Sequence, residues 1–230
     1  MRDAPRRADA ADERVPRFDR TERVVHWCNA CLFLVLIATG AALYAGPVST
    51  LVGRRHLVRT IHVYCGLALP LPVLAGLVLR SGRQLRDDVR RLSRWDRRDR
   101  VWWRRSTRSQ ARLGKFNPGQ KLNATFIAAS VVVMLATGSI MHWFERFPDD
   151  WRTGATFVHD WFALGIGLAA LGHILLALSD GDGLQGMVRG SVPRAWAQAN
   201  RPRWYAEVRG ESDPAGAAGG PVGDLAAGAE

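Results

Sequence analysis

Four long stretches with almost no charged side chains alternate along the chain with segments rich in arginine. The uncharged stretches cover residues 24–44, 61–79, 122–143 and 155–179, and Asp160 is the one charged residue within them. The hydrocarbon core of a bilayer is about 30 Å thick, which about 20 residues of α-helix cross. The apolar runs are continuous rather than alternating, so they do not fit membrane β-strands. The sequence therefore predicts an all-α integral membrane protein, a bundle of four transmembrane helices.

Whole-chain averages hide this segregation. Of the 230 residues, 47% are hydrophobic and 23% are charged, and the mean hydropathy of -0.09 resembles that of a soluble protein. A net charge of +11 and a pI near 11.0 are typical of nucleic-acid-binding proteins. The basic residues, however, lie between the apolar stretches. We therefore predict membrane lipid, and no nucleic acid, as a partner.

The basic residues fall on one side of the predicted bundle. Residues 1–23 hold seven Arg, the connection 80–121 holds thirteen Arg and two Lys, and five Arg follow residue 179, so that 27 of the 32 basic residues lie on this side. The positive-inside rule predicts that both termini and this connection are cytoplasmic, in a bacterial inner membrane. Within the connection, 83–105 is either a basic helix on the membrane surface or a solvated loop.

The sequence divides into a cytoplasmic N-terminal segment, a membrane domain, a cytoplasmic C-terminal segment and a tail. The membrane domain covers 24–179, with a kink in its second span predicted by Pro70 and Pro72. The C-terminal segment covers 180–208. Residues 209–230 are rich in Gly and Ala, which predicts a disordered tail.

The three cysteines, Cys28, Cys31 and Cys65, lie in the apolar stretches. An odd number there does not predict a disulfide framework. No His follows the C-x-x-C pair, so covalent haem attachment is not predicted, and a single pair does not make a zinc ribbon. We interpret all three as small apolar helix residues.

Five of the six histidines lie in or at the ends of the predicted spans. Ionisable groups in a membrane are costly and indicate function. The topology puts two of them at the cytoplasmic level, His26 and His173, and two at the outer level, His62 and His159. His142, also at the outer level, is the last residue but one of its span, so we interpret it as interfacial. His56 lies in the first outer loop and is not expected to bind a metal.

The spacing of the last pair is the most informative. Fourteen residues separate His159 from His173, which in a helix is a rise of about 21 Å with both side chains within about 40° of one face. One stripe thus offers an imidazole at each side of the membrane, and imidazole is an axial ligand of haem iron. Helix packing is the alternative use of a single membrane histidine.

Small residues near these histidines fit a flat cofactor or, equally, close helix packing. They are Gly40 and Gly66 in the first two spans and Gly165, Gly167 and Gly172 in the fourth. Arginines near His26 and His62 either pair with carboxylates of the cofactor or only set the topology. The tetrapeptides IATG (37–40) and LATG (135–138) indicate similar packing of the first and third spans, but they do not establish a repeat.

Several longer motifs resemble those of a known family over residues 17–208. They are RFDRTERVVHW and IATG in the first span, IHVYCG in the second, GKFNPGQK before the third, HDWFALGIGLAALGH in the fourth, and GMVRGSVPRAWAQANRPRWY after it. The chain resembles the gamma subunit, a di-haem cytochrome b, of membrane-bound respiratory formate dehydrogenases. The resemblance implies that His26 and His173 hold an inner haem b and that His62 and His159 hold an outer one.

It also implies a quinone site beside the inner haem, formed by Asn117, Gly119 and Gln120. Amide side chains hydrogen-bond carbonyls, and Gly lets the backbone approach. From the residues alone, NPGQ is an ordinary turn that caps a helix.

The resemblance implies an electron-transfer subunit of a formate:quinone oxidoreductase complex, with no formate-oxidising site of its own. Its implied partners are an iron–sulfur beta subunit and a molybdenum or tungsten catalytic alpha subunit. A cytochrome b of a nickel–iron hydrogenase, or of another molybdoenzyme, is the nearest alternative. A non-haem membrane adaptor, with histidines that serve helix packing, is the alternative of another class.

Overall fold

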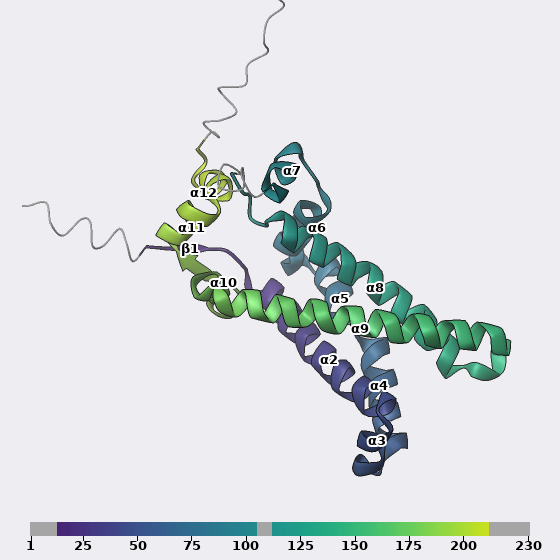
Figure 1. Ribbon diagram of the computed structural model, residues 1–230. Helices are drawn as coiled ribbons and strands as arrows, with labels where there is room; N and C mark the ends of the chain where they lie inside the picture. Colours follow the sequence, from purple (N-terminus) through teal and green to yellow (C-terminus); the bar gives the residue numbers. More distant parts are fainter. Residues whose placement is uncertain (1–12, 105–111, 212–230) are drawn as a thin grey trace, which may run out of the picture. The chain divides into compact units, whose positions relative to one another are not determined.

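The structure is a computed structural model that describes residues 13–104 and 112–211 (Figure 1). The chain divides into two compact units. The larger unit comprises Arg14–Trp95 and Gly119–Val192. The smaller unit comprises the described parts of Met1–Glu13, Asp96–Pro118 and Pro193–Glu230. Most of the predicted disordered tail, 212–230, lies outside the described residues.

Four long apolar stretches of helix dominate the larger unit, and they confirm the predicted helical membrane fold. Each contains a window of mean hydropathy between 1.8 and 2.0, and their lengths of 25, 24, 25 and 31 residues suffice to cross a bilayer. They are α2 (Arg20–Tyr44), α4 (Arg55–Ala68) continued by α5 (Leu71–Val78), α8 (Pro118–His142) and α9 (Asp149–Ser179).

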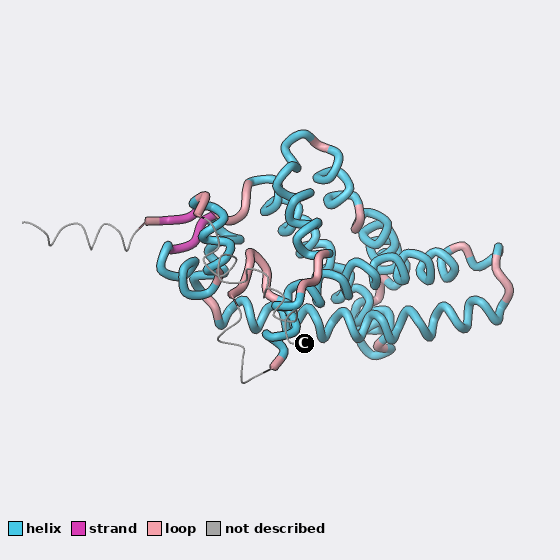
Figure 2. The backbone as a smooth tube through the Cα atoms, turned by 90° about the horizontal axis from the view of Figure 1, so that it is seen from above, coloured by secondary structure: helices cyan, strands magenta, loops and turns pink. Residues whose placement is uncertain are grey.

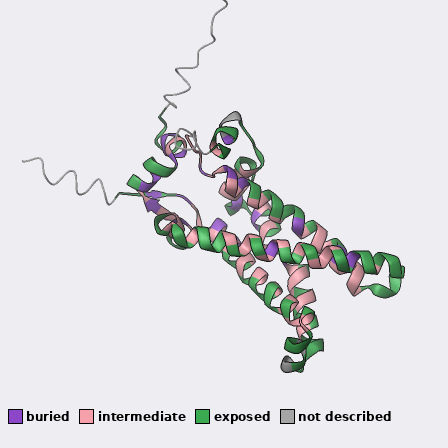
Figure 3. Cartoon of the chain, in the orientation of Figure 1, coloured by how far each residue is buried: buried purple, intermediate pink, exposed green. Residues whose placement is uncertain are grey.

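The surfaces of these helices are apolar and exposed. No more than 11% of any apolar window is buried inside the chain, and exposed and intermediate residues predominate along the long helices (Figure 3). Leu34, Val132, Leu168 and Leu176 are all more than half exposed. Exposure of so much apolar area to water would cost about 25 cal/mol per Å². The exposed faces of the long helices are therefore suited to lipid.

Polar residues extend the helices beyond their apolar cores. α2 begins at Arg20, four residues before the predicted start at 24, because Asp19 and Glu22 form a capping box. In it Glu22 N–H donates to Asp19 Oδ1 at 2.8 Å, and Asp19 N–H donates to Glu22 Oε2 at 2.7 Å. α9 likewise begins at Asp149, ahead of the predicted 155.

The second span is interrupted where the prolines predict a kink. α4 ends at Ala68 and α5 begins at Leu71, with Pro70 between them. Pro70 has no N–H to donate, and Leu69 N–H bonds to Gly66 O at 3.3 Å in a tightened turn. The span therefore consists of two helical segments.

The connections also contain short elements. α3 (Gly46–Val52) follows α2, and η1 (Arg80–Gly82) leads into α6 (Arg83–Ser93). η3 (Phe144–Arg146) joins α8 to α9, and α10 (Gly181–Arg189) follows α9. The region 83–105 was predicted as either one basic helix or a loop, and its described part forms the two helices α6 and α7 (Arg97–Trp103).

A small sheet that the sequence did not predict joins the two ends of the larger unit. β1 (Arg14–Pro16) pairs with β2 (Ser191–Pro193) (Figure 2). The Arg14 guanidinium donates to Gln185 Oε1 at 2.9 Å and to the Ser191 carbonyl at 2.8 Å. The segment before the first span is thereby bonded to the segment after the fourth.

The smaller unit contains α7, α11 (Arg194–Asn200) and α12 (Pro202–Arg209). Its core is aromatic, with Trp196, Trp204 and Tyr205 all buried. Arg203 pairs with Asp96 at 3.1 Å, and Arg194 pairs with Glu13 at 2.7 Å. These ion pairs link segments that are far apart in the sequence.

Candidate functional site

Four of the six histidines form two pairs inside the larger unit. The ring centroids of His26 and His173 are 6.2 Å apart, with an interplanar angle of 58°. The rings of His62 and His159 are 6.3 Å apart, with an angle of 62°. The pairing is that expected from the sequence, and the two pairs have nearly the same geometry.

This separation fits a metal ion held between two imidazoles. A metal–nitrogen bond to histidine is about 2.0–2.1 Å long, and the bound nitrogen lies about 1.2 Å from its ring centre. Two rings on opposite sides of one ion therefore have centroids about 6.4 Å apart. Aromatic rings that pack directly have centroids about 4.5–7 Å apart, so the observed spacing admits an ion between the rings but does not require one. Both pairs match the bis-imidazole spacing to within about 0.2 Å.

The helices determine the levels of the two pairs. His159 and His173 both lie on the unbroken helix α9, so about 21 Å of helix separates them. His26 lies in the second turn of α2, and His62 lies in the second turn of α4. The two pairs therefore occupy opposite ends of the four-helix region, which we call the inner pair (His26 and His173) and the outer pair (His62 and His159).

Each histidine of the outer pair lies against a Thr-Gly step of a neighbouring helix. Thr39 Oγ1 lies 2.9 Å from His62 Nδ1, and Thr137 Oγ1 lies 3.0 Å from His159 Nδ1. A Cβ added to the next residue, Gly40 or Gly138, would lie 3.3 Å from the Cε1 atom of the same ring. These threonines were not among the predicted site residues, although the IATG and LATG motifs contain them.

Near the inner pair, hydrogen bonds join the start of α2 to the segment after α9. We call this set of contacts, made by Arg23, Trp27 and Gly190, the clamp. Arg23 Nη1 donates to the Val188 carbonyl at 2.9 Å, and Trp27 Nε1 donates to the Met187 carbonyl at 3.3 Å. The Trp27 ring in turn lies edge-on to the His26 ring, at 5.3 Å. Two of the sequence motifs described above, RFDRTERVVHW and GMVRGSVPRAW, thus contact each other and join the start of α2 to α10.

Gly190, the residue that follows α10, forms the third part of the clamp. Its φ of +92° lies in the left-handed region, which favours glycine. Its carbonyl accepts the backbone N–H groups of Arg17 and Phe18, at 2.8 and 3.1 Å. A Cβ there would lie 2.9 Å from the Phe18 carbonyl oxygen, so the backbone approach requires a residue without a side chain.

The remaining two histidines lie apart from these pairs. His142 is the last residue of α8, with its ring 5.2 Å from that of Trp143. Its Nδ1 is buried and has no hydrogen-bond partner among the described residues. His56 is exposed and lies in the first turn of α4, rather than in a loop as the sequence suggested.

The predicted quinone residues lie at the start of α8. Asn117 immediately precedes the helix, and Gly119 and Gln120 lie in its first turn. All three are half-buried. Pro118 is the first residue of the helix, a position that proline favours because its missing N–H is not needed there. The observed backbone agrees with the helix-starting turn expected from the residues alone.

The other glycines and the arginines have more varied surroundings. A Cβ on Gly66 would meet Leu36 at 3.8 Å and one on Gly165 would meet Phe126 at 3.4 Å, which are ordinary packing contacts. A Cβ on Gly167 or Gly172 would meet no atom within 4 Å. Arg23 and Arg55 both donate to backbone carbonyls, of Val188 and Leu43.

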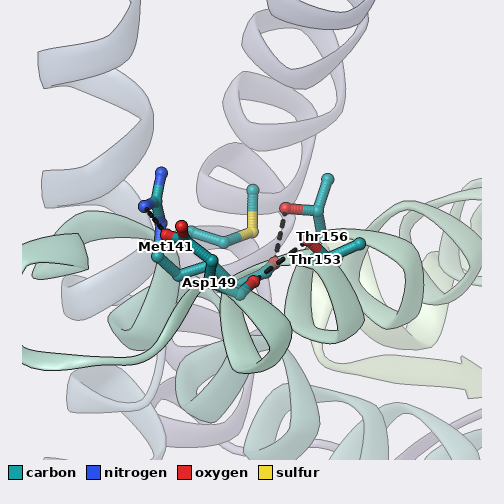
Figure 4. Close-up of a pocket in the computed structure, with 5 residues that line it drawn as sticks. Met141, Asp149, Thr153 and Thr156 are labelled. Atoms are coloured by element: carbon teal, nitrogen blue, oxygen red, sulfur yellow. Dashed lines mark hydrogen bonds and ion pairs between the residues drawn. The ribbon is translucent and has the colours of Figure 1, made fainter.

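A polar pocket lies between the end of α8 and the start of α9 (Figure 4). It is lined by Met141, Asp149, Arg152, Thr153 and Thr156. Arg152 pairs with Asp149 at 2.7 Å, and both threonine hydroxyls donate to carbonyls of the preceding turn. None of the predicted site residues lines this pocket.

Comparison with known proteins gives a family and several relatives. The sequence profile described as prokaryotic cytochrome b561 matches residues 17–190. The chain is 26% identical to the cytochrome b556 subunit of the nitrate-inducible formate dehydrogenase of Escherichia coli (strain K12), over 81% of this chain and 88% of that protein. A second cytochrome b556 subunit of formate dehydrogenase in the same strain is 25% identical, over 85% of this chain and 93% of its own length.

The cytochrome b556 subunit of the Haemophilus influenzae formate dehydrogenase is also 25% identical, over 85% of this chain and 84% of that protein. The resemblance found in the sequence motifs is thereby confirmed. The family match covers all four long helices and both histidine pairs. On this evidence of sequence and helical architecture, the chain belongs to the prokaryotic cytochrome b561 family.

Proposed function

We propose that this chain is a di-haem electron-transfer subunit, with one haem b between His26 and His173 and a second between His62 and His159. The family is one of haem b proteins. The observation that carries the proposal is that four histidines of the apolar helices meet as two pairs at two levels, with ring centroids 6.2 and 6.3 Å apart, a spacing that would admit an iron ion between the rings. Because the two histidines of each pair would both hold the iron, a haem bound there would supply one-electron transfer rather than oxygen binding.

The chain's own residues would orient the two groups. The clamp at Gly190, Arg23 and Trp27 keeps α2 beside the segment that follows α9, so that the imidazoles of the inner pair stay opposite each other. At the outer pair, the Thr-Gly steps at 39–40 and 137–138 hold the rings of His62 and His159 in place. In a bilayer the apolar faces of the long helices would be covered by lipid, which would lower the local dielectric between the two levels.

We further propose that the inner pair faces the cytoplasm of a bacterial inner membrane. The support is the segregation of the 32 basic residues, of which 27 lie in segments on one side of the four spans. Both termini and the connection 80–121 would then be cytoplasmic. The outer pair would face the compartment from which electrons arrive.

The relatives suggest the partners. All three that we compared are cytochrome subunits of formate dehydrogenases. By analogy, this chain anchors a complex in which a molybdenum or tungsten alpha subunit oxidises formate to carbon dioxide, a proton and two electrons. An iron–sulfur beta subunit would pass the electrons to the outer level. The same helical bundle would also serve a hydrogenase cytochrome, but the relatives favour formate dehydrogenase.

We propose that quinone accepts the electrons near the inner level, at Asn117, Gly119 and Gln120. The two amide side chains can donate to the carbonyl oxygens of a quinone. Gly119 leaves room for a ring to approach the backbone of the first turn of α8. Reduction of one quinone takes two electrons and two protons, and the cytoplasm would supply the protons.

A spectrum tests the central proposal most directly. The chain, purified with whatever subunits accompany it, should show b-type haem bands in its reduced-minus-oxidised spectrum, with two haems per chain by extraction. Formate added to the intact complex should reduce both haems, and hydrogen should not. A chain free of haem would overturn the proposal and favour a membrane adaptor, whereas reduction by hydrogen alone would favour the hydrogenase alternative.

A further inference from the structure

The outer pair differs from the inner pair in the hydrogen bonds of its rings. Thr39 and Thr137 each lie about 3 Å from an Nδ1 atom of the outer pair. Among the residues that the structure describes, no hydrogen bond reaches a ring nitrogen of His26 or His173. The ring separations of the two pairs are similar. The pairs therefore differ in the hydrogen bonding of their rings and not in the spacing of their rings.

Each threonine hydroxyl has one proton, and that proton is donated to a backbone carbonyl of the threonine's own helix. Thr39 Oγ1 lies 2.6 Å from the Val35 carbonyl oxygen, one helical turn back, and Thr137 Oγ1 lies 2.8 Å from that of Val133. A carbonyl oxygen only accepts, so the hydroxyl proton points to the carbonyl. The hydroxyl oxygen is then left as an acceptor towards the histidine, and Nδ1 must carry the proton of that bond.

This arrangement fixes the tautomer of both outer rings. A neutral imidazole protonated at Nδ1 has its free lone pair on Nε2. Gly40 and Gly138 lie against the Cε1 edge of the same rings, where a side chain would displace them. Each ring is therefore bonded to a threonine and flanked by a glycine of the neighbouring helix, and the Leu36 backbone carbonyl is a further hydrogen-bond partner of His62.

We propose that Thr39 and Thr137 are positioning residues that hold His62 and His159 with Nε2 free for the outer haem iron and make both ligands more basic. The inference rests on the proposed role of these histidines as haem ligands. A hydrogen bond that an imidazole donates from its second nitrogen raises its basicity as a ligand. A more basic ligand stabilises the ferric state and lowers the reduction potential, and within residues 13–104 and 112–211 the rings of the inner pair receive no such hydrogen bond.

The direction of this effect agrees with the proposed route of electrons. A lower potential at the outer level and a higher one at the inner level favour transfer from the partner side towards the quinone side. The two threonines would thus give two otherwise similar bis-histidine sites different potentials.

The test uses the full chain in its complex, with Thr39→Val and Thr137→Val singly and together. Valine keeps the shape and removes the hydroxyl. The readouts are a redox titration of both haems, the low-spin EPR signals and the haem content. His62→Ala identifies which component is the outer haem. Thr60→Val is the matched control, because the Thr60 hydroxyl on α4 donates to the His56 carbonyl, one turn back in its own helix, at 2.9 Å.

We expect the valine variants to raise the potential of the outer haem and change its EPR signal, with the inner haem unchanged. Thr39→Ser and Thr137→Ser, which retain the hydroxyl, should restore both properties. Selective loss of the outer haem in the valine variants, reversed by serine, would equally support the proposal. Unchanged potentials with both haems present would overturn it, as would equal losses in the valine and serine variants.

Failure of this inference is separable from failure of the proposed function. If His62→Ala and His159→Ala leave the outer haem in place, the ligand assignment itself is wrong. If those two variants remove it while the valine variants behave as Thr60→Val does, only the role of the threonines is wrong.

Discussion

The hydroxyl of Thr137 lies 3.0 Å from Nδ1 of His159. Thr39 and His62 repeat this relationship at 2.9 Å, and a glycine follows the threonine in both cases. The first two spans and the last two are therefore built alike around the outer pair, with 23 residues from threonine to histidine in one and 22 in the other. The motifs IATG and LATG are therefore alike both in sequence and in the contacts that their Thr and Gly residues make with a histidine.

Gly138→Ala is expected to weaken haem binding at the outer pair. The new Cβ would lie 3.3 Å from His159 Cε1, so the ring must move by a few tenths of an ångström. Changes behind a metal-binding histidine typically cost about 10–100-fold in affinity. The measurement is the amount of haem that the purified variant retains after dilution, or after addition of a haem-free protein that competes for the haem. Gly154→Ala is the control, because a Cβ there meets nothing within 4 Å, and a normal haem content in both variants would argue against the close fit.

Removal of any one ligand should remove one haem and leave the other. His62→Ala and His159→Ala should each lose the outer haem, and His26→Ala and His173→Ala the inner one, because one imidazole does not complete the axial pair. The two members of a pair should give the same difference spectrum. His142→Ala should keep both haems. If His142→Ala loses a haem that His62→Ala keeps, the ligand set is wrong.

Gly190→Ala should loosen the inner pair. The left-handed φ of +92° is strained by about 1–3 kcal/mol for other residues, and the new Cβ would lie 2.9 Å from the Phe18 carbonyl. For a chain of 150–250 residues, each kcal/mol corresponds to about 2–4 °C in melting temperature. Thermal unfolding followed through the haem bands should show the loss, with the inner haem released first. Gly181→Ala, at the other end of the helix α10 that Gly190 caps and with no atom within 4 Å of its Cβ, should melt like the wild type.

The sequence was sufficient to predict the four long helices and the pairing of the histidines. Uninterrupted apolar runs specify membrane helices almost by themselves, since only helices and closed β-barrels satisfy the backbone in lipid and the strands of a barrel alternate apolar with polar residues. The level of each histidine then follows from helix direction, as for His62 and His159. These properties depend only on local composition and on the order of the spans.

Contacts between distant segments could not be predicted in the same way. The pairing of β1 with β2 joins three residues at each end of the larger unit, too few to give a periodic signal. The Thr39 bond to His62 depends on how two helices rotate against each other, which hydrophobic patterns around a lipid-exposed helix specify poorly. The early start of α2 reflects the cap at Asp19 and not hydropathy, and α9 begins early at two acidic residues, Asp149 and Asp150, that follow Pro148.

Reporter fusions test the orientation. Fusions at the C-terminus and at residue 95 should report the cytoplasm, and fusions near residue 50 the periplasm, because the basic residues resist translocation. The measurement is the paired activity of a reporter that is active only outside and one that is active only inside. A periplasmic C-terminus would reverse the assignment of the inner and outer pairs.

The last prediction separates quinone chemistry from electron transfer, by Asn117→Leu with Gln120→Leu. Gln120 and Thr137 are seventeen residues apart on α8, a rise of about 26 Å, so the change at Gln120 is far from the outer pair. The outer haem should therefore be unaffected, and because neither residue is one of the four histidines, the inner haem should also remain bound and reducible by formate. Quinone reduction should fall, since each lost hydrogen bond to a buried carbonyl costs about 1–3 kcal/mol.

A loss of that size amounts to roughly tenfold in binding or rate for every 1.4 kcal/mol. The matched measurement within the same variant is reduction of an artificial dye that takes electrons from the partner subunits, which should proceed at the normal rate. Slow quinone reduction with normal dye reduction places the defect after the haems. If the double variant reduces quinone as fast as the wild type, residues 117–120 serve only to start α8, and the quinone site must lie elsewhere around the inner pair.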